Sequence, residues 1–206
     1  MRKNTKLAAV VVTAAGTLAA TMLALPAEAR PSSPNKVYTA SLDALNTHIS
    51  GSAARGTATV AVTGDRVDVA IDVAGVSPGT LHPQHIHAGP ECATMADAGS
   101  DGILDVIDGL PKYGNILISL DDTFADPTDA SLGFPVASAD GTYSYRASGS
   151  KSHFQDELDQ ALKAGTRHVV IHGVDPATPL PSTVKSLPGL PTWATLPVAC
   201  GELVQH

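Results

Sequence analysis

Alternation of apolar and polar residues predicts a protein built mainly from short β-strands. In the segments 57–62 and 67–73, every second residue is apolar. The residues Thr63-Gly64-Asp65 between them favour a tight turn, so the two segments are expected to form a hairpin. In the second segment the apolar residues share one face, which predicts one core side and one solvent side.

Six more short β-like runs occur, separated by Gly, Pro and Asp clusters. They are residues 37–42, 85–87, 116–120, 142–146, 168–172 and 201–204. About eight short strands are typical of an all-β sandwich or barrel. Between two of the runs, residues 152–164 have the spacing of a short amphipathic helix. Residues 175–197 are rich in proline and predict a long surface loop.

The first 29 residues have the pattern of a secretory signal peptide, with a basic start, an apolar run and the small-residue motif Ala27-Glu28-Ala29. Cleavage leaves a lead-in, residues 30–36, and one domain, residues 37–206. An uncleaved membrane anchor is the alternative, because the run is about long enough to span a bilayer. We expect a secreted, extracellular protein with no membrane contact after cleavage.

Charge and cysteine content narrow the class further. The chain has 13 basic and 20 acidic residues and a formal net charge of −7, which argues against a nucleic-acid partner. In an exported chain, Cys92 and Cys200 favour a single disulfide over two free thiols. Such a bond closes a loop of over 100 residues, for which chain entropy predicts about 4.7 kcal/mol of stabilisation.

A group of histidines carries the candidate chemistry. In the string LHPQHIH, His85 and His87 share one strand face about 6 to 7 Å apart, so both rings can reach one metal ion. Imidazole ligands suit copper, zinc, iron and nickel. A pair of exposed histidines on a polar strand is the alternative. A further histidine, His172, ends the apolar run that begins at Val169.

The order LHPQHIH, Cys92, RHVVIH and Ala199-Cys200-Gly201 resembles the copper/zinc superoxide dismutase family. The resemblance implies an eight-stranded Greek-key β-sandwich and a Cys92–Cys200 disulfide. It also implies copper binding by three histidines, with a fourth that braces the site through hydrogen bonds. The implied ligands are His85, His87 and His172, and the bracing residue is His82.

Longer strings resemble bacterial secreted CHRD-domain proteins over most of the mature chain. The most specific parts are HPQHIH, VVIHGVD and PVACG. This second resemblance implies the same sandwich in a secreted module.

The chain also departs from the dismutase pattern. Residues 88–152 contain no histidine, so a zinc site of the family type is absent. The arginine that guides superoxide in that family is replaced by Pro197, which weakens electrostatic focusing of an anion. Arg146 and Arg167 are candidate substitutes for that arginine.

Two more histidines are candidates for a fourth metal ligand. His153 lies at the start of the predicted helix, and His168 shares a strand face with His172. However, His168 lies about 13 Å from His172 along the strand, which argues against a shared ion.

An acidic segment, Asp97 to Asp108, approximates a twelve-residue calcium loop. Glycine at position 3 and aspartate at position 12 predict weak binding. A solvated acidic turn is the alternative. The candidate calcium ligands are Asp97, Asp101, Ile103, Asp105 and Asp108.

Three functions remain open from the sequence. The first is a secreted CHRD-type module that holds copper at His85, His87 and His172 without turnover. The second is a copper-only superoxide dismutase, in which the same histidines form a redox centre that converts superoxide to oxygen and hydrogen peroxide. The third is a structural or partner-binding module with a hydrogen-bonded histidine cluster. The choice between copper and zinc and the oligomeric state also remain open.

Overall fold

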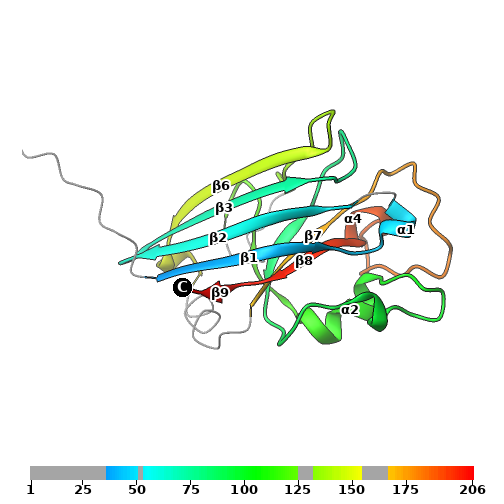
Figure 1. Cartoon of the computed structure of the whole chain (residues 1–206), viewed down its shortest axis with the longest axis horizontal. Coiled ribbons are helices and arrows are strands. Elements are labelled where there is room, and N and C mark those ends of the chain that lie inside the picture. The colour runs from blue at the N-terminus through cyan, green and yellow to red at the C-terminus, as the bar shows by residue number, and fades with distance from the viewer. Residues whose placement is uncertain (1–35, 51–52, 125–131, 155–166) are drawn as a thin grey trace, which may run out of the picture. The chain divides into compact units, whose positions relative to one another are not determined.

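The computed structural model describes residues 36–50, 53–124, 132–154 and 167–206 (Figure 1). These residues belong to one compact unit, residues 32–206. The signal peptide and lead-in expected from the sequence lie outside the described residues. The same holds for the expected helix at 152–164 beyond the short 3-10 turn η2, Lys151–Phe154.

Within the described residues, nine strands form the fold, and all of their pairings are antiparallel. They are β1 Lys36–Ala44, β2 Arg55–Thr63, β3 Arg66–Ala74, β4 Gln84–His87, β5 Ile116–Ser119, β6 Thr142–Ser150, β7 His168–His172, β8 Pro197–Glu202 and β9 Val204–Gln205. Eight of them follow the path β5-β4-β7-β8-β1-β2-β3-β6, and β9 pairs with β1. The prediction of an all-β fold with eight main strands is confirmed.

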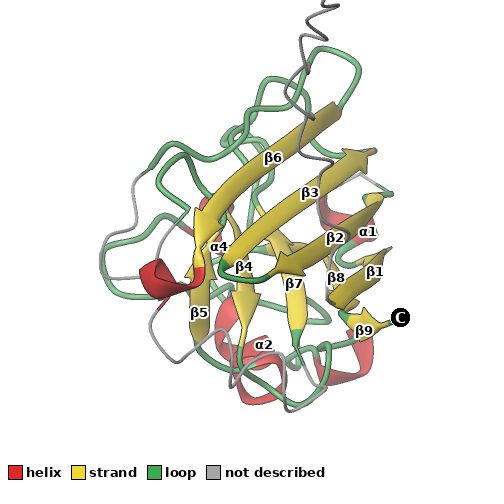
Figure 2. Cartoon of the chain, turned by 90° about the vertical axis from the view of Figure 1, so that its left-hand side faces the viewer, coloured by secondary structure: helices red, strands yellow, loops and turns green. Residues whose placement is uncertain are grey.

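The path folds into two layers (Figure 2). One layer contains β1, β2, β3 and β6, and the other contains β5, β4, β7 and β8. They join where Asp43 and Ala44 of β1 pair with β8. Because the chain crosses from β3 to β4 and returns from β5 to β6, strands distant in sequence become neighbours.

The hairpin of β2 and β3 follows the apolar pattern. Thr63 pairs with Arg66 across a two-residue turn, and Gly64 has a φ of 60°, a conformation that glycine adopts without strain. The alternate apolar residues of β3 are at most 4% exposed. The predicted core and solvent faces are therefore confirmed.

The main hydrophobic core lies between the two layers and takes residues from both. A second, smaller cluster lies on the other face of β7, around Val170 and the Cys92–Cys200 disulfide. The predicted disulfide is confirmed. The second cluster comprises Leu45, Ala93, Leu104, Tyr113, Val170 and Cys200.

Short helices lie in the connections. They are α1 Thr47–Ser50, η1 Met95–Asp97, α2 Val106–Tyr113 and α4 Thr192–Thr195. In the part of the chain that the structure describes, no helix has the length and apolar character needed to cross a membrane.

Two elements differ from the pattern-based prediction. The final strand pairing begins at Pro197, earlier than expected, because β8 completes the sheet beside β7. The helix α2 was not predicted, since its acidic start was read as part of a calcium loop. Its sequence signal is the capping box of Asp105 and Asp108, in which each side chain accepts from the other's backbone N–H.

Candidate metal centre

Strands β4 and β7 bring the three predicted histidines together. His85 and His87 lie on β4, and His172 ends β7. Their neighbours Ile86 and Ile171 face the main core, so the histidines lie on the opposite face of the sheet. The register between β7 and β8 shifts after Ile171, at the point where His172 enters the site.

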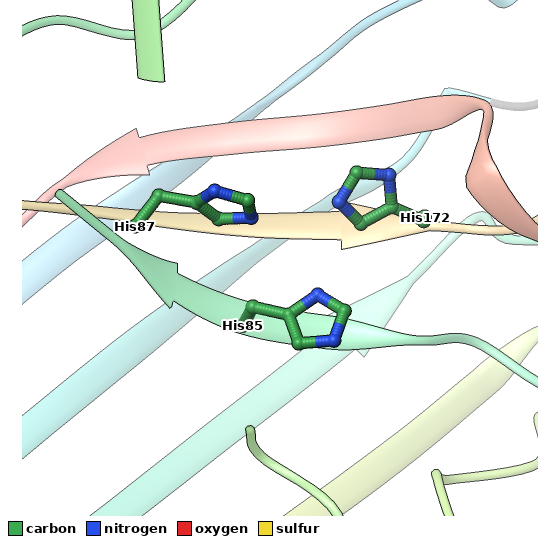
Figure 3. A group of neighbouring side chains, drawn as sticks. All are labelled: His85, His87 and His172. Carbon is green, nitrogen blue, oxygen red and sulfur yellow. The ribbon is translucent and has the colours of Figure 1, made fainter. Parts of the chain in front are cut away.

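The three rings converge on one point. One ligand nitrogen from each lies within 4.8 Å of the other two. The ring centroids are 5.7 Å apart for His85 and His87, 5.7 Å for His85 and His172, and 5.9 Å for His87 and His172. Figure 3 shows the three rings side by side, on strands that are distant in sequence. Among the described residues, this is the one group of three histidine, cysteine or acidic ligands close enough for a single ion.

Hydrogen bonds set the tautomers of two rings. The Nδ1–H of His87 donates to the carbonyl oxygen of Gly114 at 2.8 Å, and that of His172 donates to Thr195 at 2.9 Å. Each Nε2 therefore keeps its lone pair available to a metal. The Nε2 of His87 and the Nδ1 of His85 are both shielded from solvent and have no hydrogen-bond partner.

Burial keeps the rings neutral. His87 and His172 are 2% and 4% exposed, and His85 is half-buried. Burial lowers the pKa of His87 to about 3, aided by the nearby charge of His172, and lowers the pKa of His172 to about 4. The pKa of His85 is held well below its ordinary value, mainly by burial and to a smaller extent by the charges of His172 and His87. All three rings are ready to bind a cation at neutral pH, without first losing a proton.

The ring of His82 contacts the backbone on both of its nitrogens. Its Nδ1 lies 3.1 Å from the carbonyl oxygen of His172, and its Nε2 lies 3.1 Å from that of Ser77. Burial lowers its pKa, although the contacts with these carbonyls act in the opposite direction. A neutral ring has one N–H and donates to one of these oxygens at a time. His82 thus ties the backbone of a ligand strand to the preceding loop.

Two aromatic rings flank the cluster. Tyr113 lies edge-on to His87, with ring centroids 4.8 Å apart, and 6.3 Å from His172. Phe134 lies 5.3 Å from His85. The pKa of Tyr113 is raised, mainly by burial and next by the negative charges of Asp105 and Asp108. Its hydroxyl therefore stays protonated.

The segments that cover the site are tied to each other. Asp105 caps α2 and also accepts from the backbone N–H of Lys185 in the proline-rich loop at 2.7 Å. Asn46 donates to the carbonyl oxygens of Leu104 and Pro197, and accepts from the N–H of Leu104. These bonds connect β8, α2 and the loop, so the cover forms a connected layer.

Two other candidate ligands stand apart from the cluster. His168 is 1% exposed and pairs in register with His87, but it is not in the group that can share one ion. The backbone of His153 belongs to η2, and its side chain lies outside the described residues.

The candidate arginines are held in other contacts. Arg146 forms an ion pair with Asp72 on the outer side of β3 and β6 at 2.8 Å. Arg167 donates to the carbonyl oxygen of Ala88 at 3.1 Å. The place of the guiding arginine is occupied by Pro197, which begins β8.

The acidic segment uses its carboxylates as backbone acceptors. Asp97 accepts from Thr94, Asp101 accepts from the N–H of Ile103, and Asp108 accepts from the N–H of Gly99. The carbonyl oxygen of Ile103 also accepts from Gly99. No three of these acids come close enough to share an ion. Calcium binding by this segment stays a prediction from the sequence pattern.

Similar chains are found among solved structures. No protein-family model matches the chain, and no curated protein matches it. Among the solved structures, 30 chains match. One is a Cu/Zn superoxide dismutase from Brucella abortus, with 18% sequence identity and a TM-score of 0.42 over 81% of this chain and 98% of that chain.

The sequence reasoning missed the residues that contact the histidine rings. Gly114 and Thr195 contact them through backbone carbonyls, and Tyr113 contacts them through its ring. A carbonyl has no side-chain signature, so no sequence signal identifies the first two. An amphipathic reading of Val106 to Tyr113 would have placed Tyr113 on a helix, but its position beside the cluster follows only from the tertiary structure.

Proposed function

We propose that this protein is a secreted module that holds a single copper ion at His85, His87 and His172. One observation carries the proposal. Two buried imidazole nitrogens, His85 Nδ1 and His87 Nε2, have no hydrogen-bond partner and lie beside a third ligand nitrogen. Buried polar atoms without partners cost roughly 1 to 3 kcal/mol each, so an unpaired pair at one point needs an explanation. A bound cation supplies it.

The donor set favours copper. All three donors are neutral imidazoles, and both cysteines are in a disulfide, so no thiolate competes. Imidazole suits both copper and zinc, and a given nitrogen site binds Cu(II) more tightly than Zn(II). Copper, when bound, supplies one-electron exchange between Cu(II) and Cu(I).

The unpaired nitrogens argue against a purely structural cluster. In a hydrogen-bonded cluster the ring nitrogens pair with each other or with the backbone. Here one nitrogen of His87 and one of His172 bond to carbonyl oxygens, while the nitrogens that face the centre do not bond to one another.

Export is part of the proposal. The leader pattern of residues 1–29 predicts it, and the Cys92–Cys200 disulfide suits an oxidising compartment. The CHRD-like strings of the mature chain fit such a secreted module.

Superoxide dismutation is the second candidate function. The partly exposed His85 residue favours it, because the site lies near the surface, although the ligand nitrogens themselves are buried. The ion pair of Arg146 with Asp72 and the proline at position 197 weigh against it, since neither supplies a cation to attract an anion.

Copper titration of the mature, disulfide-intact protein tests the main proposal. We expect one copper per chain, a Cu(II) electron paramagnetic resonance (EPR) spectrum with nitrogen hyperfine structure, and preference for copper over zinc in competition. His87→Ala should abolish this site. His48→Ala is the matched control, because His48 is exposed and lies outside the cluster. Equal binding by wild type and His87→Ala would refute the proposal.

Decay of pulsed superoxide separates the two functions. Copper-loaded protein that accelerates decay, with the effect lost in His85→Ala, would support dismutation. Decay no faster than in His85→Ala, with copper bound to the wild type, would leave a module that holds copper without turnover.

A further inference from the structure

Tyr113 is the residue that joins α2 to the histidine cluster. It is the last residue of α2 and is fully buried. Its ring lies at 63° to that of His87 and at 88° to that of His172, so it meets both ligand rings edge-on. It packs in the smaller hydrophobic cluster with Val170 and Cys200, on the same side of the sheet as the ligands.

The ring of Tyr113 is held from two sides. Its hydroxyl donates to the carbonyl oxygen of Val106, at the start of the same helix, at 3.3 Å. A Cβ at Gly109 would lie 2.4 Å from Cε1 and 2.7 Å from the hydroxyl oxygen of Tyr113, so the ring lies directly against the helix backbone. Gly109 is therefore required for this ring position.

The next residue completes the contact with His87. Gly114 ends α2 with a φ of 72°, and its carbonyl oxygen accepts from Nδ1–H of His87. The N–H of Gly89 donates to the carbonyl oxygen of Tyr113 at 2.6 Å, and that of Ala88 donates to Asn115 at 2.9 Å. The end of α2 is thus paired along the chain that follows β4.

Two consecutive residues therefore control the orientation of His87. The carbonyl of Gly114 selects which nitrogen carries the proton, and the ring of Tyr113 packs against the imidazole plane. The torsion that turns an imidazole about its Cβ–Cγ bond has broad minima, so packing has to set it. Groups that orient metal ligands in this way commonly change metal affinity by about 10- to 100-fold when they are removed.

We infer that Tyr113 is a positioning residue of the metal centre, whose ring, pressed against α2 at Gly109, sets the orientation of His87 and His172. This inference rests on the proposed metal-binding function. Tyr113 is not a ligand, because its hydroxyl is bonded to Val106. Its role is to keep the Nε2 atoms of the two histidines aimed at one point.

Three substitutions test the inference with copper alone as the probe. Tyr113→Leu removes the ring, and we expect copper affinity to fall by about 10- to 100-fold with a broadened or split Cu(II) EPR spectrum. Gly109→Ala keeps the ring but displaces it, and we expect an altered EPR spectrum although alanine favours the helix. Tyr113→Phe keeps the ring in place, and we expect affinity within about threefold of wild type and an unchanged spectrum.

Tyr145→Leu is the matched control. Tyr145 is also buried and also donates its hydroxyl to a backbone carbonyl, that of Asp121, but it lies on β6 in the main core. We expect it to lower the unfolding temperature of the metal-free protein with copper affinity and EPR spectrum unchanged. If it weakens copper binding as much as Tyr113→Leu, general destabilisation explains both results and the inference fails.

The outcomes separate this inference from the proposed function. If the wild type binds no copper, the proposed function fails and the inference fails with it. If the wild type binds one copper and folded Tyr113→Leu has the same affinity and spectrum, the inference alone is overturned. If Tyr113→Leu does not fold, Gly109→Ala decides: an altered spectrum supports the inference, and an unchanged one overturns it.

Discussion

The two faces of strands β4 and β7 are made from alternate residues of the same segments, but one face is mainly apolar and the other carries the histidines. The inner face presents Ile86, Val169 and Ile171 to the main core, where each is fully buried among apolar side chains. The outer face presents His85, His87 and His172, which are mostly buried but leave two nitrogens without partners. The inner face stabilises the fold, whereas the outer face gives up some stability to hold three lone pairs together.

The cover differs as well. The second layer of the sheet covers the inner face, while segments from outside the sheet cover the outer face. These segments are joined to the sheet by a disulfide and by the bond of Asn46 to Pro197, and to each other by the bond of Asp105 with Lys185. A sheet layer is held by many regular backbone bonds, and a cover of loops is held by few specific ones. We therefore expect the outer face to respond to single changes that leave the main core intact.

Loss of the disulfide has the largest expected effect. The double variant Cys92→Ala, Cys200→Ala removes a covalent link between residues 108 positions apart in the sequence. We expect the free energy of unfolding to fall by about 4.7 kcal/mol. Copper affinity should fall too, because Cys200 packs beside Tyr113 in the smaller cluster. Urea unfolding and copper titration measure the two effects. A folded variant with unchanged copper affinity would show that the cover does not depend on the disulfide.

A pair of adjacent substitutions separates the faces. Ile171→Ala removes buried apolar volume from the main core, and we expect a loss of about 2 to 5 kcal/mol in unfolding free energy with copper still bound. His172→Ala should abolish copper binding with a smaller loss of stability. Denaturant unfolding and copper stoichiometry of both variants test this. Loss of copper in folded Ile171→Ala would mean that the two faces are not separable.

Low pH should destabilise the metal-free protein, because the histidines of the outer face are buried as neutral rings. The folded pKa values of His87 and His172, about 3 and about 4, lie below the ordinary value of 6.5, so the unfolded chain binds more protons in between. Stability is therefore full above pH 6.5 and falls as the pH drops towards 4. At pH 4, the lowered pKa of His172 alone reduces the free energy of unfolding by about 3 kcal/mol.

Urea unfolding of the metal-free protein between pH 8 and pH 4 measures this slope. Replacement of His172 by Gln should flatten it, and replacement of the exposed His48 should leave it unchanged. A wild-type profile that is flat over this range would contradict the burial of neutral rings.

The smallest expected effect comes from removing an ion pair on the outer side of the layer that contains β3 and β6. Arg146 and Asp72 form an ion pair in which both side chains are more than half exposed. Arg146→Ala should change the unfolding free energy by less than about 1 kcal/mol and leave copper affinity and superoxide decay unchanged. A clear drop in copper affinity or in the rate of superoxide decay would show that Arg146 contributes to the metal centre.

Much of this architecture was predictable because it depends on local periodicity. Alternation in β2 and β3 identified both the hairpin and its buried face. The spacing of His85 and His87 placed both rings on one face, since that follows from the two-residue repeat of a strand. The helix α2 escaped prediction because its cap is acidic and it contains Pro111, a residue that argues against a helix.

The sequence by itself determined the β character, the two faces of each strand and the shared face of His85 and His87, because these depend on neighbours one or two residues away. Only the tertiary structure decided that His172 meets His85 and His87, which requires the pairing of β4 with β7 across more than 80 residues of chain. It also decided which nitrogen of each ring is free, because the carbonyls of Gly114 and Thr195 are acceptors that any residue type supplies. Long-range packing, and no local pattern, turns three histidines into one site.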